Sequence, residues 1–153
     1  MCPEYYNFHR SYEPLLYSDR MIYSPGCPVF KNDDGNLLEE SYYVDFITSP
    51  APNAGAIMNS QPQYLDKIPE ALYTRGAKVL SLAAYHNCDA LILGAWGCGV
   101  FRNKVPLVAQ MFADLLLPKG QFWGRFKSIV FSILDSSIEQ KTLTEFHRRF
   151  ATN

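Results

Sequence analysis

A short apolar strand, a glycine-rich loop and a helix follow one another in the sequence, and this succession constrains the fold more than any other feature. The segment Ala90–Leu93 (ALIL) is wholly apolar, residues 94–103 (GAWGCGVFRN) are rich in glycine, and an apolar helical face begins at Val105. A strand without polar alternation is typical of a parallel sheet that helices cover on both faces. The succession therefore predicts an α/β fold.

The glycine-rich loop has the composition of an anion-binding turn. Because Gly94, Gly97 and Gly99 have no Cβ, the backbone can turn sharply and approach a ligand closely. Free N–H groups at a helix start, together with the helix dipole, suit a phosphate or diphosphate. A Gly-x-Gly beside a helix is explained about as often by a structural turn. No Gly-Lys-Ser/Thr follows, and Asn103 departs from the G-x-G-x-x-G spacing, so neither familiar nucleotide loop is present.

The rest of the chain alternates between strands and helices. The strands that we expect are two short pieces at 20–24 and 29–31, separated by Pro25-Gly26, and longer ones at 42–48 and 128–134. We expect helices over 68–85, from 105 to about 117, and over 137–150, with Asn103 as the N-cap of the second. These elements predict one domain over residues 1–153, a three-layer α/β/α arrangement around a mixed, mainly parallel sheet.

Composition limits the classes of partner. Fourteen basic and fifteen acidic residues give a net charge of −1, which argues against broad electrostatic binding of nucleic acid or an anionic membrane. Four cysteines without C-x-x-C spacing predict neither a zinc site nor a disulfide framework. We find no signal peptide and no apolar run of roughly 20 residues that would span a bilayer. We therefore expect a cytoplasmic protein without a metal or cofactor.

Aromatic residues are concentrated in the first quarter of the chain, and two interpretations of them stay open. Such rings need a surface to pack against. The plainer interpretation is a segment that wraps the core, and the sharper one is a stacking platform for a nucleobase. The residues are Tyr5, Tyr6, Phe8, Tyr12, Tyr17, Tyr23 and Phe30.

Three segments resemble the bacterial-type poly(ADP-ribose) glycohydrolase family. The stretch from Ala90 to Leu116 resembles its phosphate loop and following helix, and residues 47–53 (ITSPAPN) and 16–30 resemble two further parts. The resemblance implies a macrodomain-like fold that holds ADP-ribose at the carboxyl ends of the central strands. Free ADP-ribose or an ADP-ribosylated protein is then the expected partner.

The resemblance also implies a set of ligand-binding residues. The backbone amides of Gly97, Cys98, Gly99 and Val100 would bind the diphosphate, and Phe101 would pack against the ribose nearest the scissile bond. Asp135, just after the last strand, would lie toward the nucleoside end. The remaining candidates, which flank these positions in the matching segments, are Thr48, Ser49, Asn53, Ala95 and Trp96.

The sequence departs from the family pattern where catalysis is expected. The family places a Gly-Gly-Gly loop and a Gln-Glu-Glu catalytic segment upstream of the matching region, and residues 1–153 contain neither. Glu39-Glu40 does not match that motif. We therefore expect a binding module without the N-terminal strand and catalytic loop, and without glycohydrolase activity by itself. Alternatives are an enzyme whose catalytic glutamate segment comes from another chain and an inert remnant of a split gene. An open sheet edge would also favour self-association.

Cys98 offers a second route to catalysis. A thiol between glycines at a helix start can have a lowered pKa and act as a nucleophile, but it needs a base. No motif links His9, His86 or His147 to Cys98, so we expect a small residue beneath a phosphate loop. His86, at a helix end, is expected to be a terminal cap.

Overall fold

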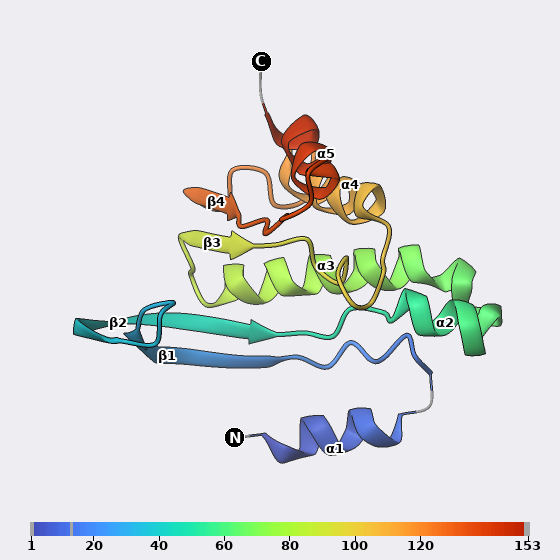
Figure 1. Cartoon of the computed structure of the whole chain (residues 1–153), viewed down its shortest axis with the longest axis horizontal. Coiled ribbons are helices and arrows are strands. Elements are labelled where there is room, and N and C mark those ends of the chain that lie inside the picture. The colour runs from blue at the N-terminus through green and yellow to red at the C-terminus, as the bar shows by residue number, and fades with distance from the viewer. Residues whose placement is uncertain (1, 13, 152–153) are drawn as a thin grey trace.

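The computed structural model describes residues 2–12 and 14–151 and has a mixed α/β fold (Figure 1). Its elements, in chain order, are α1 (Pro3–Ser11), β1 (Ile22–Lys31), β2 (Leu37–Thr48), α2 (Ala54–Ser60), the 3₁₀ helix η1 (Pro62–Lys67), α3 (Ile68–Tyr85), β3 (Ala90–Leu93), α4 (Val105–Leu116), β4 (Ser128–Phe131) and α5 (Lys141–Phe150). None of the helices in residues 2–12 and 14–151 combines the length with the apolar character that a membrane span requires.

The strands form two separate pairs. β3 and β4 are parallel, in a register that runs from Ala90 opposite Ser128 to Leu93 opposite Phe131, which confirms the predicted parallel pairing. β1 and β2 form an antiparallel hairpin. Over the described residues each sheet has two strands, so the outer edges of all four strands have no strand partner.

The prediction of two short strands before residue 32 is wrong, because β1 is continuous. The pairing register shifts between Ser24 and Cys27, where Pro25 has no N–H to donate and Gly26 has a φ of 59°. The Gly26 N–H donates to Oδ1 of Asp45 on β2 at 2.7 Å. Pro25-Gly26 therefore makes a bulge that the hairpin accommodates, whereas the sequence indicated a break.

The core lies between the helices and one face of β3 and β4. Leu72 and Leu80 of α3 and Val108 and Leu115 of α4 are fully buried at its centre. Every second strand residue, such as Leu91, packs against this cluster. The opposite face is open, since Ile92 is 78% exposed and Val130 is 54% exposed. The expectation that helices cover β3 on both faces is therefore wrong for the described chain.

One of the expected helices begins later than the sequence indicates. The predicted bounds of α3 are correct, but α5 begins at Lys141 and not near residue 137. Residues before it form a turn in which Gln140 has a φ of 43°. The expectation that the aromatic segment wraps the core is also wrong for α1, which has no buried residue. Its rings pack against each other and against Arg20, whose guanidinium lies 3.6 Å from the Phe8 ring centroid.

Candidate functional site

The glycine loop consists of two consecutive turns. Cys98 N–H donates to the Ala95 carbonyl at 3.0 Å, and Arg102 N–H donates to the Gly99 carbonyl at 3.0 Å. Gly97 occupies the third position of the first turn with a φ of 71°, a conformation that favours glycine. The loop emerges from β3 and leads into α4, so both ends are held by regular structure.

Between Trp96 and Asn103, four backbone amides have no hydrogen-bond partner among the described residues. They belong to Gly97, Gly99, Val100 and Phe101, whereas the amides of Trp96 and Cys98 donate to Gly94 and Ala95 within the loop. Gly99 and Val100 are exposed, and a side chain at position 99 would meet nothing within 4 Å. The loop therefore has free donors with open space at its tip. Cys98 does not contribute one, contrary to expectation, because its amide closes the first turn.

The segment after β2 lies directly against the glycine loop. The indole N–H of Trp96 donates to the Ser49 carbonyl at 3.3 Å. A Cβ at position 97 would lie 2.5 Å from Cβ of Ala51, so the two backbones are in close contact there. The Gly55 N–H donates to the Phe101 carbonyl at 3.0 Å. The structure thus brings the candidates of residues 48–53 together with those of residues 95–101, although they are far apart in sequence.

Thr48 and Asn53 have structural positions within this assembly. Thr48 is the last residue of β2 and pairs with Ile22. The Asn53 side chain accepts from the Ala56 N–H at 3.1 Å and so caps α2, while its own N–H donates to the Leu15 carbonyl at 2.9 Å. Ligand contacts by these two residues stay predictions.

Phe101 has an aromatic neighbour that the sequence did not reveal. Its ring stacks on Tyr17, with centroids 5.9 Å apart and an interplanar angle of 29°. Tyr17 has a φ of 57°, a left-handed conformation that is uncommon for a bulky residue. One of the early tyrosines therefore lies beside the candidate site, while α1 does not contribute to the core.

The environment of Cys98 argues against a nucleophile. Burial raises the pKa of its thiol to about 11, because the thiolate would be desolvated. Its Sγ contacts the carbonyl of Trp96 at 3.9 Å, and no histidine within the described residues bonds to it. A thiol that is protonated at neutral pH, without a base, fits the interpretation of a small residue beneath the loop.

Asp135 is a helix-capping residue. Its carboxylate accepts from the Ser137 hydroxyl and N–H and from the N–H groups of Thr142 and Leu143 at the start of α5. These bonds, above all that from the Ser137 hydroxyl, lower its pKa to about 2. Capping accounts for both oxygens, and the predicted contact with a nucleoside stays a prediction.

Asn103 was predicted to cap α4, and this prediction is wrong. The N-cap is Lys104, without a side-chain cap bond, while the Asn103 side chain is directed to the loops. Its Nδ2 donates to the Pro52 carbonyl at 2.8 Å and to the Gly97 carbonyl at 3.0 Å. The residue is only 3% exposed.

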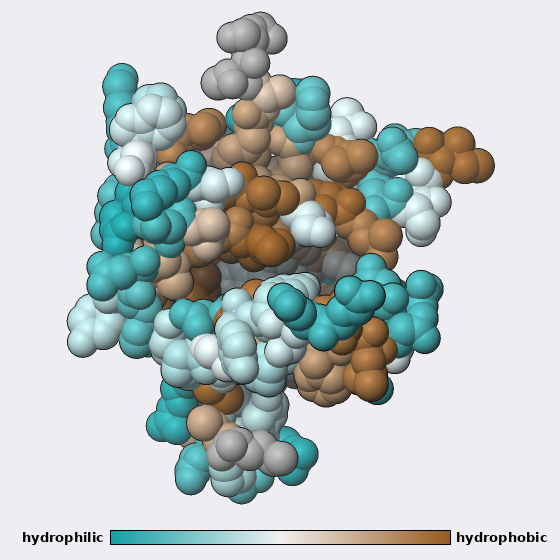
Figure 2. Space-filling model, turned by 90° about the vertical axis from the view of Figure 1, so that its left-hand side faces the viewer, coloured by the Kyte–Doolittle hydropathy of each residue, from teal (hydrophilic) through white to brown (hydrophobic). Residues whose placement is uncertain are grey.

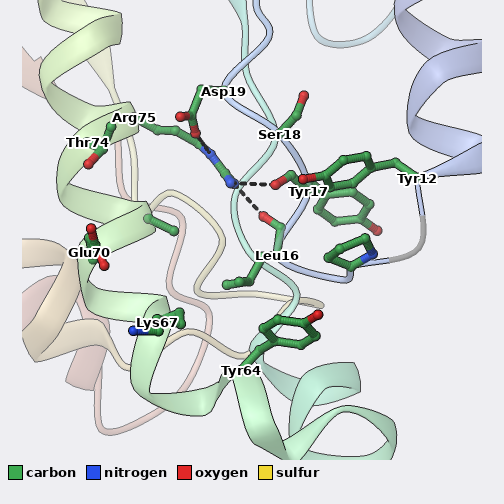
Figure 3. A pocket seen from close by; sticks show the side chains of 12 residues that line it. Tyr12, Leu16, Tyr17, Ser18, Asp19, Tyr64, Lys67, Glu70, Thr74 and Arg75 are labelled. Atoms are coloured by element: carbon green, nitrogen blue, oxygen red, sulfur yellow. Dashed lines mark hydrogen bonds and ion pairs between the residues drawn. The ribbon is translucent and has the colours of Figure 1, made fainter.

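A buried arginine behind the site was also missed. Arg75 of α3 is 2% exposed and donates to the Asp19 carboxylate at 2.7 Å and to the Leu16 and Tyr17 carbonyls at 2.6 and 2.7 Å (Figure 3). It also donates to the Pro50 carbonyl at 3.1 Å. These bonds fasten the segment before β1 and the segment after β2 to α3. Arg75 also lines a cavity of about 560 Å³, which extends along α3 and is not lined by the glycine loop.

Comparisons with known proteins agree with the resemblance in the sequence. The microbial-type PARG catalytic domain matches residues 1–32. Poly(ADP-ribose) glycohydrolase from Deinococcus radiodurans, in complex with ADP-ribose, superposes with a TM-score of 0.90 at 42% identity, covering 96% of this chain and 58% of that chain. The enzyme from Thermomonospora curvata, bound to the inhibitor ADP-HPD, gives a TM-score of 0.91 at 48% identity over 97% of this chain and 56% of that chain. The chain belongs to the bacterial-type poly(ADP-ribose) glycohydrolase family.

The chain therefore has the mixed α/β fold of this family and spans 58% and 56% of the two relatives described. No curated protein matches it. Among the residues that the structure describes, no cluster of three or more His, Cys, Asp or Glu side chains is arranged to hold a metal ion.

Proposed function

We propose that the chain binds ADP-ribose, or a related nucleotide diphosphate, at the glycine loop. The observation that carries this proposal is the set of unpartnered amides at Gly97, Gly99, Val100 and Phe101, in a loop fixed at both ends. Backbone donors ahead of a helix suit a diphosphate, because its oxygens accept several N–H bonds at once. Relatives with the same fold were crystallised with ADP-ribose and with ADP-HPD, which supports this ligand class.

In this proposal, the loop and its neighbours contact different parts of the ligand. The free amides bind the diphosphate, and the stacked pair of Phe101 and Tyr17 forms an apolar wall for the adjoining ribose. Either free ADP-ribose or the ADP-ribose of a modified protein would meet these contacts. A cytoplasmic location stays a prediction.

Replacing Phe101 by alanine is expected to weaken ADP-ribose binding about tenfold. The ring supplies an aromatic wall whose loss costs about 1–1.5 kcal/mol of binding free energy, and 1.4 kcal/mol corresponds to a factor of ten. Isothermal titration of the folded variant and the unchanged chain measures the difference. Phe126→Ala is a poor control because that ring is buried, so Phe30→Ala, on the exposed face of β1, is the matched variant. An absence of heat from the unchanged chain at millimolar ADP-ribose would refute the proposed function.

We further propose that residues 1–153 do not hydrolyse poly(ADP-ribose) by themselves. Cleavage at the ribose needs a positioned carboxyl group near the leaving oxygen. Asp19 is engaged with Arg75, Asp135 caps α5, and none of the described carboxylates bonds to the glycine loop. The chain is then a module that binds without cleaving.

The alternative function is a glycohydrolase whose catalytic glutamate segment is supplied by another polypeptide. The open strand edges and the exposed Ile92 and Val130 favour this candidate, because such a surface is normally covered. Viewed from the end at which β3 and β4 begin, the surface is hollowed, and apolar side chains gather above the hollow (Figure 2). More than two fifths of each relative also has no counterpart here, since coverage is 58% and 56%.

Incubation with poly(ADP-ribose) distinguishes the two candidates. We expect no release of ADP-ribose above the buffer rate from the chain alone, because no acid faces the scissile bond. Chromatographic detection of released ADP-ribose measures this. Release that depends on an added polypeptide would support the alternative, whereas release by the chain alone would contradict the binding module.

A further inference from the structure

We infer that Asn103 is a positioning residue that locks residues 49–53 against the glycine loop and thereby fixes the direction of the free amides. Its Nδ2 bridges the carbonyls of Pro52 and Gly97 at 2.8 and 3.0 Å. Its backbone N–H donates to the same Gly97 carbonyl at 3.0 Å. One residue therefore closes the loop between positions 97 and 103 and joins it to a segment about fifty positions earlier.

The packing around this bridge leaves little freedom. Asn103 is 3% exposed, Ala51 is 3% exposed, and Pro52 is also fully buried. A Cβ at position 97 would lie 2.5 Å from both Ala51 Cβ and Asn103 Nδ2. Because both segments meet at van der Waals contact and through directional hydrogen bonds, a shift of one segment moves the other. The amides of Gly97 and Gly99 lie inside the part of the chain that is held in this way.

The other polar atom of the Asn103 side chain, Oδ1, indicates which half of the amide is used. Asn103 Oδ1 is buried and has no hydrogen-bond partner among the described residues. A buried acceptor without a partner lowers the stability of the fold. A side-chain amide at position 103 is therefore unfavourable unless its NH₂ group makes necessary hydrogen bonds. A cap of α4 would use the oxygen, and here the nitrogen is used. The arrangement therefore favours a role that depends on the two N–H donors.

Asn103→Leu tests this role, because leucine has a similar branched shape and no donors. We expect faster deuterium exchange in peptides covering residues 49–53 and 94–103, and at least tenfold weaker ADP-ribose binding. Asn103→Asp should weaken binding further, since a carboxylate would face two carbonyl oxygens. Leu80→Val, a conservative change at a buried position of α3 that makes no hydrogen bond to either loop, is the control and should leave both readouts near those of the unchanged chain. If Asn103 only stabilised the fold, its replacement would lower overall stability, and the faster deuterium exchange would not be confined to these two segments.

A second measurement needs no variant and covers the case in which Asn103→Leu fails to fold. In the unchanged chain, the Asn103 side-chain NH₂ protons should exchange with solvent at least tenfold more slowly than those of the exposed Asn59. Equal exchange of the two side chains, or unchanged loop exchange in a folded Asn103→Leu, would overturn the inference.

The ligand part of this inference rests on the proposed function, and the exchange data separate the two. If the Asn103 side-chain protons are protected but the chain gives no heat with ADP-ribose, the proposed ligand is refuted. The role of Asn103 in joining the two loops then still stands. Binding by a folded Asn103→Leu with unchanged affinity would overturn the positioning role and leave the proposed function standing.

Discussion

Gly99→Val is expected to lower ADP-ribose affinity at least a hundredfold while the variant melts at the temperature of the unchanged chain. Gly99 is exposed, has no positive φ, and a Cβ there would meet nothing within 4 Å. A valine therefore fits the free protein. Its two methyl groups would, however, occupy the space in front of the amides of Gly99 and Val100. Those amides need an acceptor at about 2.9 Å, which a branched side chain prevents.

Gly97 gives the contrasting variant within the same loop. Gly97→Ala should lose stability as well as binding, because a φ of 71° costs an ordinary residue roughly 1–2 kcal/mol and its Cβ would clash with Ala51. Titration calorimetry and thermal melting of both variants separate steric exclusion of the ligand from damage to the loop. Unchanged affinity in a folded Gly99→Val would show that these amides do not contact the ligand.

The parts of the fold that sequence predicts well are those set by local periodicity. The apolar face of α3, the ALIL strand and the glycine loop depend on residues a few positions apart, and their bounds agree with the structure. β1 shows the limit of such reasoning. Pro25-Gly26 is typical of a break, but the register of the partner strand and the carboxylate of Asp45 turn it into a bulge.

The two residues that hold the site in place could not be found from local pattern. Asn103 before a proline-containing helix is typical of an N-cap, and its real acceptor, the Pro52 carbonyl, is 51 positions away. Arg75 on an amphipathic helix would ordinarily be solvated. It is buried because carbonyls of Leu16, Tyr17 and Pro50 converge on it, and only the tertiary fold brings them there.

The apolar strand ALIL predicted more burial than residues 1–153 provide. Leu91 and Leu93 pack on the core, but Ile92 remains 78% exposed on the open face. A residue of this type at the centre of a strand is normally covered. Ile92 is thus exposed where the sequence pattern predicts burial. It lies on the open face of β3, which is the surface that a second polypeptide would cover in the alternative function.

Arg75→Ala is expected to cost about 3 kcal/mol or more of unfolding free energy, which is a large part of the roughly 5–15 kcal/mol of a typical domain. The change removes four hydrogen bonds and leaves three carbonyls without that donor. Arg75→Lys should recover little, because one ammonium group cannot span the acceptors that a planar guanidinium reaches. Denaturant unfolding followed by fluorescence measures the loss.

Asp19→Asn measures how much the ion pair with Arg75 contributes to stability, apart from the hydrogen bonds of Arg75 to the carbonyls. The Asp19 side chain is 50% exposed, so the ion pair is partly screened, and its removal should cost less than about 1 kcal/mol. If the carbonyl contacts dominate, as their number suggests, Arg75→Ala must be the more damaging change by a wide margin. Because Pro50 lies in the segment that Asn103 joins to the glycine loop, Arg75→Ala should also weaken ADP-ribose binding under conditions where it remains folded. Equal losses in the two variants would mean that the salt bridge, and not the anchoring of the two segments, accounts for the contribution of Arg75.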